Sequence, residues 1–136
     1  MDLTEKAREI FASDRFATEL TGIEITSVEE HKATCTLRLG MQHRNARGMV
    51  MGGVLFTLAD FASAVAANSN CIEDGHLCWV SLDATIHYLA PAVGDNLQAT
   101  CLPLKLGHTT SLFQTIIDNL DAGKRVAIVE TTMIRV

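Results

Sequence analysis

Asp60 is the residue of this sequence best suited to chemistry, because it is the only charged residue between Gly48 and Ile72. A carboxylate among apolar residues loses hydration, so it either raises its pKa or finds hydrogen-bond donors. Perturbed carboxylates of this kind gather at functional sites. Asp60 is therefore the leading candidate for a catalytic residue. The alternative is that it faces a polar pocket or caps a neighbouring strand.

Gly52 and Gly53 precede Asp60 at the predicted start of the same helix. The first N–H groups of a helix have no partner within it, and the helix dipole makes this end positive. Such groups suit the oxyanion that develops during acyl transfer. The glycines could instead allow close packing at the turn into the helix, and the two explanations are compatible.

A long apolar helix must hold these residues in place. From Val54 to Ala67, apolar side chains cover every side of the predicted helix, and the stretch from Asn68 to Asn70 suits its end. A helix without a polar face is expected to be buried.

The rest of the chain predicts one further helix and a set of strands with short connections. The helix is expected over Asp2–Ser13, and the strands at residues 23–28, 33–39, 77–89, 96–106, 109–118 and 125–136. Short connections favour an antiparallel meander. We therefore expect an α+β fold, a single domain over residues 1–136, in which a curved antiparallel sheet wraps the long helix.

The composition of the chain excludes several classes of partner. The formal net charge of −5 argues against a nucleic-acid-binding protein. No apolar run reaches the roughly 20 residues that span a bilayer, and the N-terminus lacks a signal-peptide pattern, so we expect a cytoplasmic protein without a membrane partner. No metal site is expected, and the cysteines are expected to be unpaired and at least half-buried: Cys35, Cys71, Cys78 and Cys101.

The stretch Asn45–Asp60, NARGMVMGGVLFTLAD, resembles the PaaI-type hotdog-fold thioesterases. Their pattern is an asparagine, a glycine, a His-Gly-Gly that opens the central helix, and an aspartate two turns later. Val80–Pro91 and Gly94–Leu97 are similar to the family's following strand and turn, and the resemblance runs from Gly22 to the C-terminus. It implies a hotdog fold and hydrolysis of acyl-CoA thioesters, with coenzyme A as part of the substrate and no other cofactor.

The same resemblance implies roles for single residues. Gly52 would polarise the thioester carbonyl through its N–H, and Asp60 would act as nucleophile or general base. Asn45 would orient substrate or water, unless it only bonds its own loop. Ser81 would position the attacking water, unless it is a structural strand residue. Met51 stands where the family usually has histidine, which puts rate, loop geometry or substrate preference in doubt.

Helix geometry adds a requirement. At about 1.5 Å per residue, Gly52 and Asp60 lie roughly 12 Å apart along one helix. Groups that act on one carbonyl must each lie about 3 Å from it. Two antiparallel helices in a two-fold dimer meet this condition, because Gly52 of one subunit then faces Asp60 of the other. We therefore expect a homodimer, and the resemblance implies that dimers can pair into a homotetramer.

Further residues are candidates for substrate contacts. Gly53, Met51 and Phe56 are expected to line the acyl site, although apolar residues of this kind are more often core. His108, with Lys105, could meet the phosphates of coenzyme A, and a second basic cluster has the same potential: His43, Arg44 and Arg47. The alternative for both clusters is a solvated surface.

Two other functions fit the same fold. The first is an acyl-CoA or acyl-carrier-protein hydratase or dehydratase, which typically pairs a histidine with a carboxylate. Met51 removes the nearest histidine candidate and counts against it. The second is a non-enzymatic acyl-CoA-binding domain, which Met51 favours. A fold alone does not separate these functions.

Overall fold

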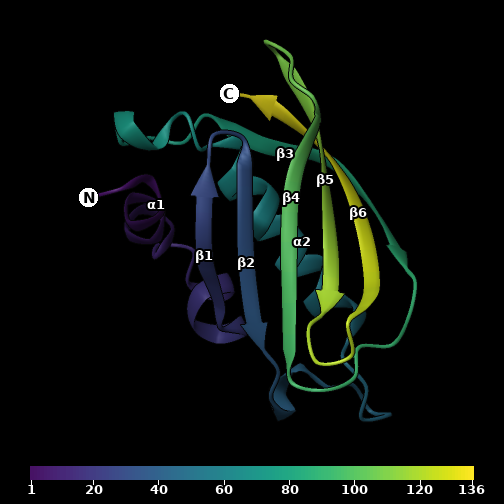
Figure 1. Ribbon diagram of the computed structural model, residues 1–136. Coiled ribbons are helices and arrows are strands. Elements are labelled where there is room, and N and C mark those ends of the chain that lie inside the picture. The colour runs from purple at the N-terminus through teal and green to yellow at the C-terminus, as the bar shows by residue number, and fades with distance from the viewer.

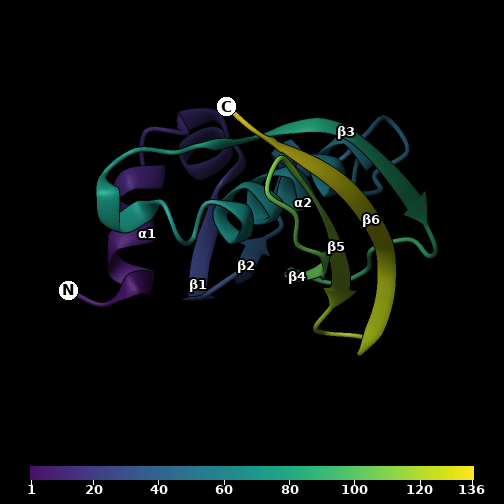
Figure 2. The same ribbon diagram turned by 90° about the horizontal axis from the view of Figure 1, so that it is seen from above.

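A six-stranded antiparallel sheet curves around one long helix in the computed structural model, which describes residues 1–136 (Figures 1 and 2). The predicted α+β hotdog fold class is confirmed. In chain order the elements are α1 (Leu3–Phe11), a short π-helix (Phe16–Thr21), β1 (Ile23–Glu29), β2 (Lys32–Arg38), a 3₁₀ turn (Met41–His43), α2 (Gly52–Ala67), a 3₁₀ turn (Ile72–Asp74), β3 (Trp79–Tyr88), β4 (Asn96–Lys105), β5 (Thr110–Asn119) and β6 (Lys124–Arg135).

The spatial order of the strands is β1-β2-β4-β5-β6-β3. The predicted meander is correct for β4, β5 and β6 but wrong for β3, which pairs with β6 rather than with β4. The connection 89–95 can reach about 23 Å when extended, whereas crossing from β3 to β4 requires about 14 Å at strand spacing. A short connection is therefore no proof that two consecutive strands are neighbours.

The core lies between the concave face of the sheet and α2. Alternate residues of β2, β4 and β5 are buried, as the period of two predicts. Leu58, Ala62 and Val65 of α2 are fully buried against them. None of the helices has the length and hydrophobicity needed to cross a bilayer.

One side of α2 stays open, so the expectation that this helix is buried on every side is wrong for the single chain. Gly53 and Asp60 are exposed, and Thr57 and Ala64 are half-buried. These four residues, spaced by three or four, lie on one side of a helix and form what we call the open face of α2. Because they carry only one charge, the sequence pattern could not separate this face from the buried ones.

The segment before β1 also differs from the prediction. Phe16–Thr21 forms a short π-helix that ends at Gly22, whose φ of 91° is left-handed. Phe16 and Leu20 point outward and are 64% and 70% exposed. The predicted helix ended at Ser13, so this π-helix was not predicted.

Two of the four cysteines contradict the prediction of unpaired thiols, because Cys71 and Cys78 form a disulfide. They flank the turn between α2 and β3, which brings their Cα atoms to 6.5 Å. Cys35 and Cys101 remain free and fully buried, as expected.

Candidate active site

Asp60 lies on the open face of α2 beside the inner face of β3. The Ser81 hydroxyl donates a hydrogen bond to Oδ1 of Asp60 at 3.2 Å. The Ser63 hydroxyl donates to the Asp60 backbone carbonyl at 2.8 Å. The structure thus brings together two of the predicted catalytic residues within one chain.

A β-bulge in β3 aims Ser81 at the helix. The pairing with β6 shifts register between Ser81 and Asp83, so Leu82 is an extra residue. Before the bulge Trp79 and Ser81 face inward, and after it Ala84 and Ile86 pack on the core. The bulge changes which residues face the helix, and it places Ser81 next to Asp60 without displacing the core residues that follow.

Asp60 borders a hollow of about 290 Å³ that the N-terminal segment helps to form. Asp14 and Phe16 line it from one side, and Thr57 and Asp60 from the other. Partial burial raises the pKa of Asp14, and the neighbouring charge of Asp60 raises it further. The hollow therefore holds two carboxylates that repel each other.

A second hollow, of about 380 Å³, continues along α2 towards its start. Met51, Gly53 and Leu20 line it, and it shares Phe16 and Thr57 with the hollow at Asp60. The two hollows together form a partly apolar groove along the open face of α2. Met51 and Gly53, two of the predicted substrate contacts, therefore line this groove, and their contact with a substrate stays a prediction.

Gly52 begins α2, and its N–H has no acceptor within the chain. Its carbonyl accepts a hydrogen bond from the Tyr88 hydroxyl at 3.1 Å. A Cβ added at Gly52 would lie 2.9 Å from the same hydroxyl oxygen. The close approach of Tyr88 gives a packing reason for glycine here, and the free N–H remains available for an anion.

Asn45 organises the loop before α2. Its side-chain oxygen accepts hydrogen bonds from the N–H groups of Arg47 at 2.9 Å and Met49 at 3.1 Å. This is the loop-stabilising alternative considered for Asn45, and its Nδ2 group makes no hydrogen bond within the chain. The side chain can therefore hold the loop through its oxygen and still offer donors to a ligand.

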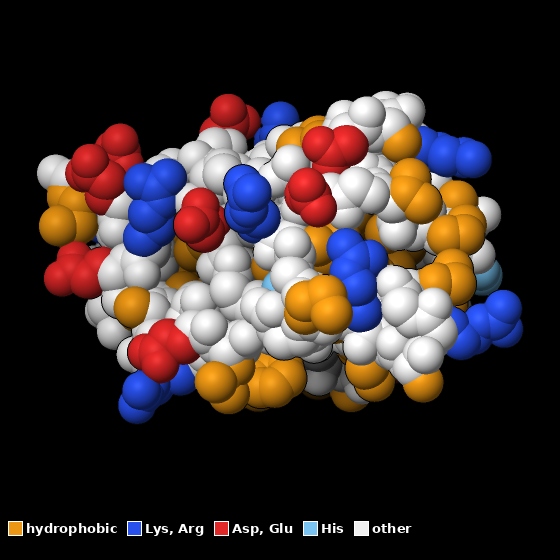
Figure 3. Space-filling model, turned by 90° about the horizontal axis from the view of Figure 1, so that it is seen from below, with side chains coloured by type: hydrophobic (Ala, Val, Ile, Leu, Met, Phe, Trp, Pro, Cys, Tyr) orange, Lys and Arg blue, Asp and Glu red, His pale blue; other side chains and the backbone are white.

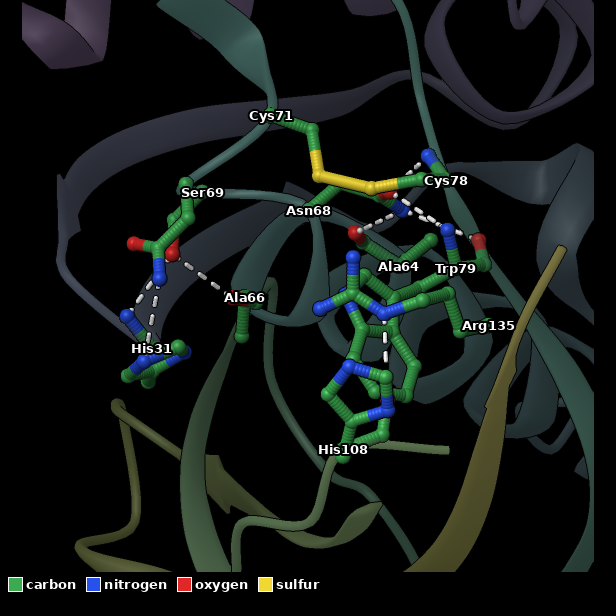
Figure 4. Close-up of a disulfide and its surroundings, with 11 residues drawn as sticks. His31, Ala64, Ala66, Asn68, Ser69, Cys71, Cys78, Trp79, His108 and Arg135 are labelled. Carbon is green, nitrogen blue, oxygen red and sulfur yellow. Dashed lines mark hydrogen bonds between the residues drawn. A yellow bond between two sulfur atoms is a disulfide. The ribbon is translucent and has the colours of Figure 1, made fainter. Parts of the chain in front are cut away.

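The other predicted contacts are more scattered. His43 is buried, with Nδ1 accepting from the Gly40 N–H and Nε2 bonded to the Thr21 carbonyl, so it does not join Arg44 and Arg47 in a basic surface. Phe56 is half-buried on α2 and lines neither hollow. His108 lies in the β4–β5 turn, near the other end of α2 and away from Asp60 of the same chain (Figures 1 and 4).

Three residues of the site were missed by sequence reasoning: Asp14, Phe16 and Tyr88. Asp14 and Phe16 lie just before and at the start of the π-helix, which no pattern in the sequence predicts. Tyr88 lies at an inward position of β3 only because of the bulge. Tyr88 and Gly52 are 36 residues apart in the sequence, so no local pattern could have linked them.

The charge repulsion in the hollow predicts a stability change. Because folding raises the pKa of Asp14, its contribution to stability is fully present below the ordinary value of 3.8 and is lost as pH rises through the folded pKa. Asp14→Asn is therefore expected to raise Tm slightly near neutral pH and to have no such effect in acid. Thermal unfolding at both pH values measures this. In an Asp60→Asn background the gain should shrink, and a gain of equal size at both pH values would contradict the assignment.

The chain is similar in sequence to known thioesterases. A profile of the thioesterase superfamily matches residues 47–130. The chain is 31% identical to mouse acyl-coenzyme A thioesterase 13, over 93% of this chain and 89% of that one. It is 34% identical to the acyl-coenzyme A thioesterase PaaI of Escherichia coli, over 85% and 79% of the two chains.

The fold is also similar to those of solved thioesterase structures. The E. coli PaaI structure superposes with a TM-score of 0.84 at 31% identity, covering 99% of this chain and 96% of that one. A hypothetical thioesterase from Streptococcus pneumoniae, solved with coenzyme A, gives a TM-score of 0.81 at 25% identity, covering 93% and 96%. The chain therefore belongs to the thioesterase superfamily, as a PaaI-type hotdog-fold thioester hydrolase.

Proposed function

We propose that this protein hydrolyses acyl-CoA thioesters at sites formed between two copies of the chain. Similarity to proteins named acyl-coenzyme A thioesterases supports the reaction class, and a related structure solved with coenzyme A supports the substrate class. The reaction needs no metal or redox cofactor, since a carboxylate and a helix N-terminus can supply its chemistry.

The observation that carries the proposal is an incomplete site in each chain. Asp60 lies on an open helix face with Ser81 bonded to it, while the free N–H of Gly52 lies about two turns away on the same helix. Both groups cannot reach one carbonyl from a single helix. A second α2, antiparallel to the first, would place its Gly52 N–H beside the first helix's Asp60 and its Asp60 beside the first helix's Gly52.

The sheet edges support such a pairing. At β1 the edge is covered by α1, where Arg8 donates to the Ile25 carbonyl at 2.8 Å and Thr4 accepts from the Val28 N–H at 3.0 Å. At β3 the edge is uncovered, and Val80 and Leu82 are 47% and 57% exposed. An open edge strand favours pairing with another strand, and a second copy of β3 fits it.

The open side of the molecule is apolar enough to be covered. In Figure 3, which views the molecule from below, hydrophobic side chains lie along the lower margin and at the right, and acidic ones lie at the left and upper centre. Exposed apolar residues include Phe16, Leu20 and Met51 of the groove. A contact through β3 and the open face of α2 would remove these side chains from water. The further pairing of dimers into a tetramer stays a prediction.

In the proposed reaction, Gly52 of one subunit donates its N–H to the thioester oxygen. Asp60 of the other subunit supplies the electron pair, either directly to the carbonyl carbon or through a water molecule that it deprotonates. Negative charge on the carbonyl oxygen is stabilised at the helix start, and coenzyme A leaves as the thiolate. On the direct route, water then cleaves the acyl–Asp60 anhydride, which releases the free acid and restores the carboxylate. Ser81 fixes the Asp60 carboxylate, and Asn45 can donate from its free amide to substrate or water.

A coenzyme A release assay with short, medium, long and aromatic acyl-CoAs tests the proposal. Release from at least one class, by the dimer and not by a monomer, is the expected result. Hydration of an enoyl-CoA without thioester cleavage would instead indicate a hydratase. Tight binding without turnover across the panel would indicate an acyl-CoA-binding domain.

Ser81→Ala is expected to lower kcat by about 10- to 100-fold, because the Asp60 carboxylate loses the hydroxyl that orients it. KM should change little, since Ser81 is not expected to hold the substrate. Steady-state kinetics measure both constants. The matched control is Ser63→Ala, whose hydroxyl bonds the Asp60 backbone carbonyl instead of its carboxylate. Equal losses of kcat in the two variants would argue against a specific role for Ser81.

A further inference from the structure

The Cys71–Cys78 disulfide lines a cavity of about 470 Å³ at the end of α2 (Figure 4). The cavity lies away from the groove at Asp60 and shares no lining residue with it. Trp79 and Phe113 give it an apolar part, and polar side chains complete it: His31, Asn70, Asp74, His76 and Arg135. A volume of this size is typical of small-molecule sites.

The disulfide is not needed to join α2 to β3, because Asn68 already does so. Its Oδ1 accepts from the N–H groups of Cys78 and Trp79, both at 2.9 Å. Its Nδ2 donates to the carbonyls of Ala64 at 2.9 Å and Trp79 at 3.0 Å. The loop that the disulfide closes is also short, and the stabilisation from closing a loop grows with its length. Breaking the S–S bond should therefore leave the fold intact.

We propose that Cys71–Cys78 is a reversible thiol–disulfide exchange site, and that the cavity beside it binds an amide-bearing low-molecular-weight thiol that reacts there. The reaction requires neither Asp60 nor thioester hydrolysis. It extends the proposed function in one respect, because hydrolysis of an acyl-CoA would release such a thiol.

The exchange step balances without any other reagent. The thiolate of the small molecule attacks Sγ of Cys71, a new S–S bond forms, and the Cys71–Cys78 bond breaks with Cys78 leaving as thiolate. We expect Cys78 to be the leaving group, because it lines the cavity together with Arg135, whose positive charge favours a thiolate there. Cys71, by contrast, is followed closely by the acidic residues Glu73 and Asp74.

The lining indicates an uncharged polar arm in the ligand. Arg135 contributes a positive charge, but Asp74 balances it, so the cavity has no strong preference for anions. Its lining combines hydrogen-bonding side chains with apolar ones, which suits amide groups on a flexible chain. Pantetheine, coenzyme A and glutathione share this chemistry.

The two remaining cysteines provide an internal comparison. Burial raises the pKa of Cys35 to about 12, and the neighbouring Cys101 adds to the effect. Burial likewise raises the pKa of Cys101 to about 12. Neither thiol lines the cavity, and both should resist exchange.

The test starts from oxidised full-length protein treated with pantetheine, coenzyme A, glutathione or 2-mercaptoethanol at equal thiolate concentration. Intact-mass and peptide-mapping mass spectrometry follow the adduct. The expected result is one thiol per chain on Cys71, formed about tenfold faster or more with the amide-bearing thiols, at a rate that saturates with their concentration. Differences among the three amide thiols identify which one the cavity prefers.

Two variants serve as controls. Cys71→Ser combined with Cys78→Ser should form no adduct while keeping a wild-type circular dichroism spectrum. Asp60→Asn should form the adduct at the wild-type rate, so a failure of hydrolysis does not affect this result. Four free thiols after oxidant treatment, equal rates for all four small thiols, or adducts on Cys35 or Cys101 would each overturn the proposal.

Discussion

Asp60→Asn is expected to lower kcat for acyl-CoA hydrolysis by about 10²- to 10⁴-fold, the range that a positioned acid–base group contributes. Asparagine has the shape of aspartate and can still accept the Ser81 hydrogen bond, but it can neither attack a carbonyl nor take a proton from water. Because Asp60 is exposed in the single chain, the loss should come without unfolding. Coenzyme A release, together with the elution volume of the dimer, measures both effects.

The matched control for Asp60→Asn is Asp14→Asn, the same chemical change on the other carboxylate of the same hollow. Most of the activity should survive in that variant. Equal losses of activity in the two variants would mean that activity depends on the total negative charge of the hollow. Asp60 would then have no role that Asp14 lacks. Wild-type turnover in Asp60→Asn would refute the catalytic assignment directly.

The long helix was predictable because one signal dominates that stretch of sequence. The run from Val54 to Ala67 contains a single charge, and no alternative element suits such a segment. The strands were predictable from their period of two. The neighbour of β3 was not, since antiparallel pairing with β4 and with β6 produces the same alternation. Only the packing of the whole sheet decides between them.

The positions of the candidate residues were predictable where spacing within one helix defines them, as for Gly52 and Asp60, whose catalytic roles stay predictions. Positions were not predictable where tertiary structure changes a pattern. Leu82 sits in the bulge of β3, so a strict period of two extended from Trp79 and Ser81 would wrongly turn Tyr88 away from the helix. The disulfide was missed for a similar reason, because Cys71 and Cys78 meet only across the turn that follows α2.

Gly52→Pro is expected to lower kcat by about 10²- to 10³-fold, because proline removes the N–H proposed to bind the oxyanion. The backbone should accept this change. Proline is favoured at the first position of a helix, and Met51 before it has ψ of 136°, in the range that a following proline prefers. Gly52→Ala is the matched control, since its Cβ meets Tyr88 in the same way but its N–H remains. Similar kcat values for the two variants would assign the loss to crowding at Tyr88.

Combining the two kinds of variant tests whether each site draws on both chains. A heterodimer of one Gly52→Pro chain and one Asp60→Asn chain has one site with both groups intact and one with neither. If Gly52 of one chain works with Asp60 of the other, the purified heterodimer should recover about half of wild-type activity, while both parent homodimers stay nearly inactive. Differently tagged, co-expressed chains allow this measurement.

If both groups came from the same chain, each site of the heterodimer would lack one of them, and mixing would restore nothing. The position of Asp60 on an uncovered helix face, about two turns from Gly52, makes recovery the expected outcome.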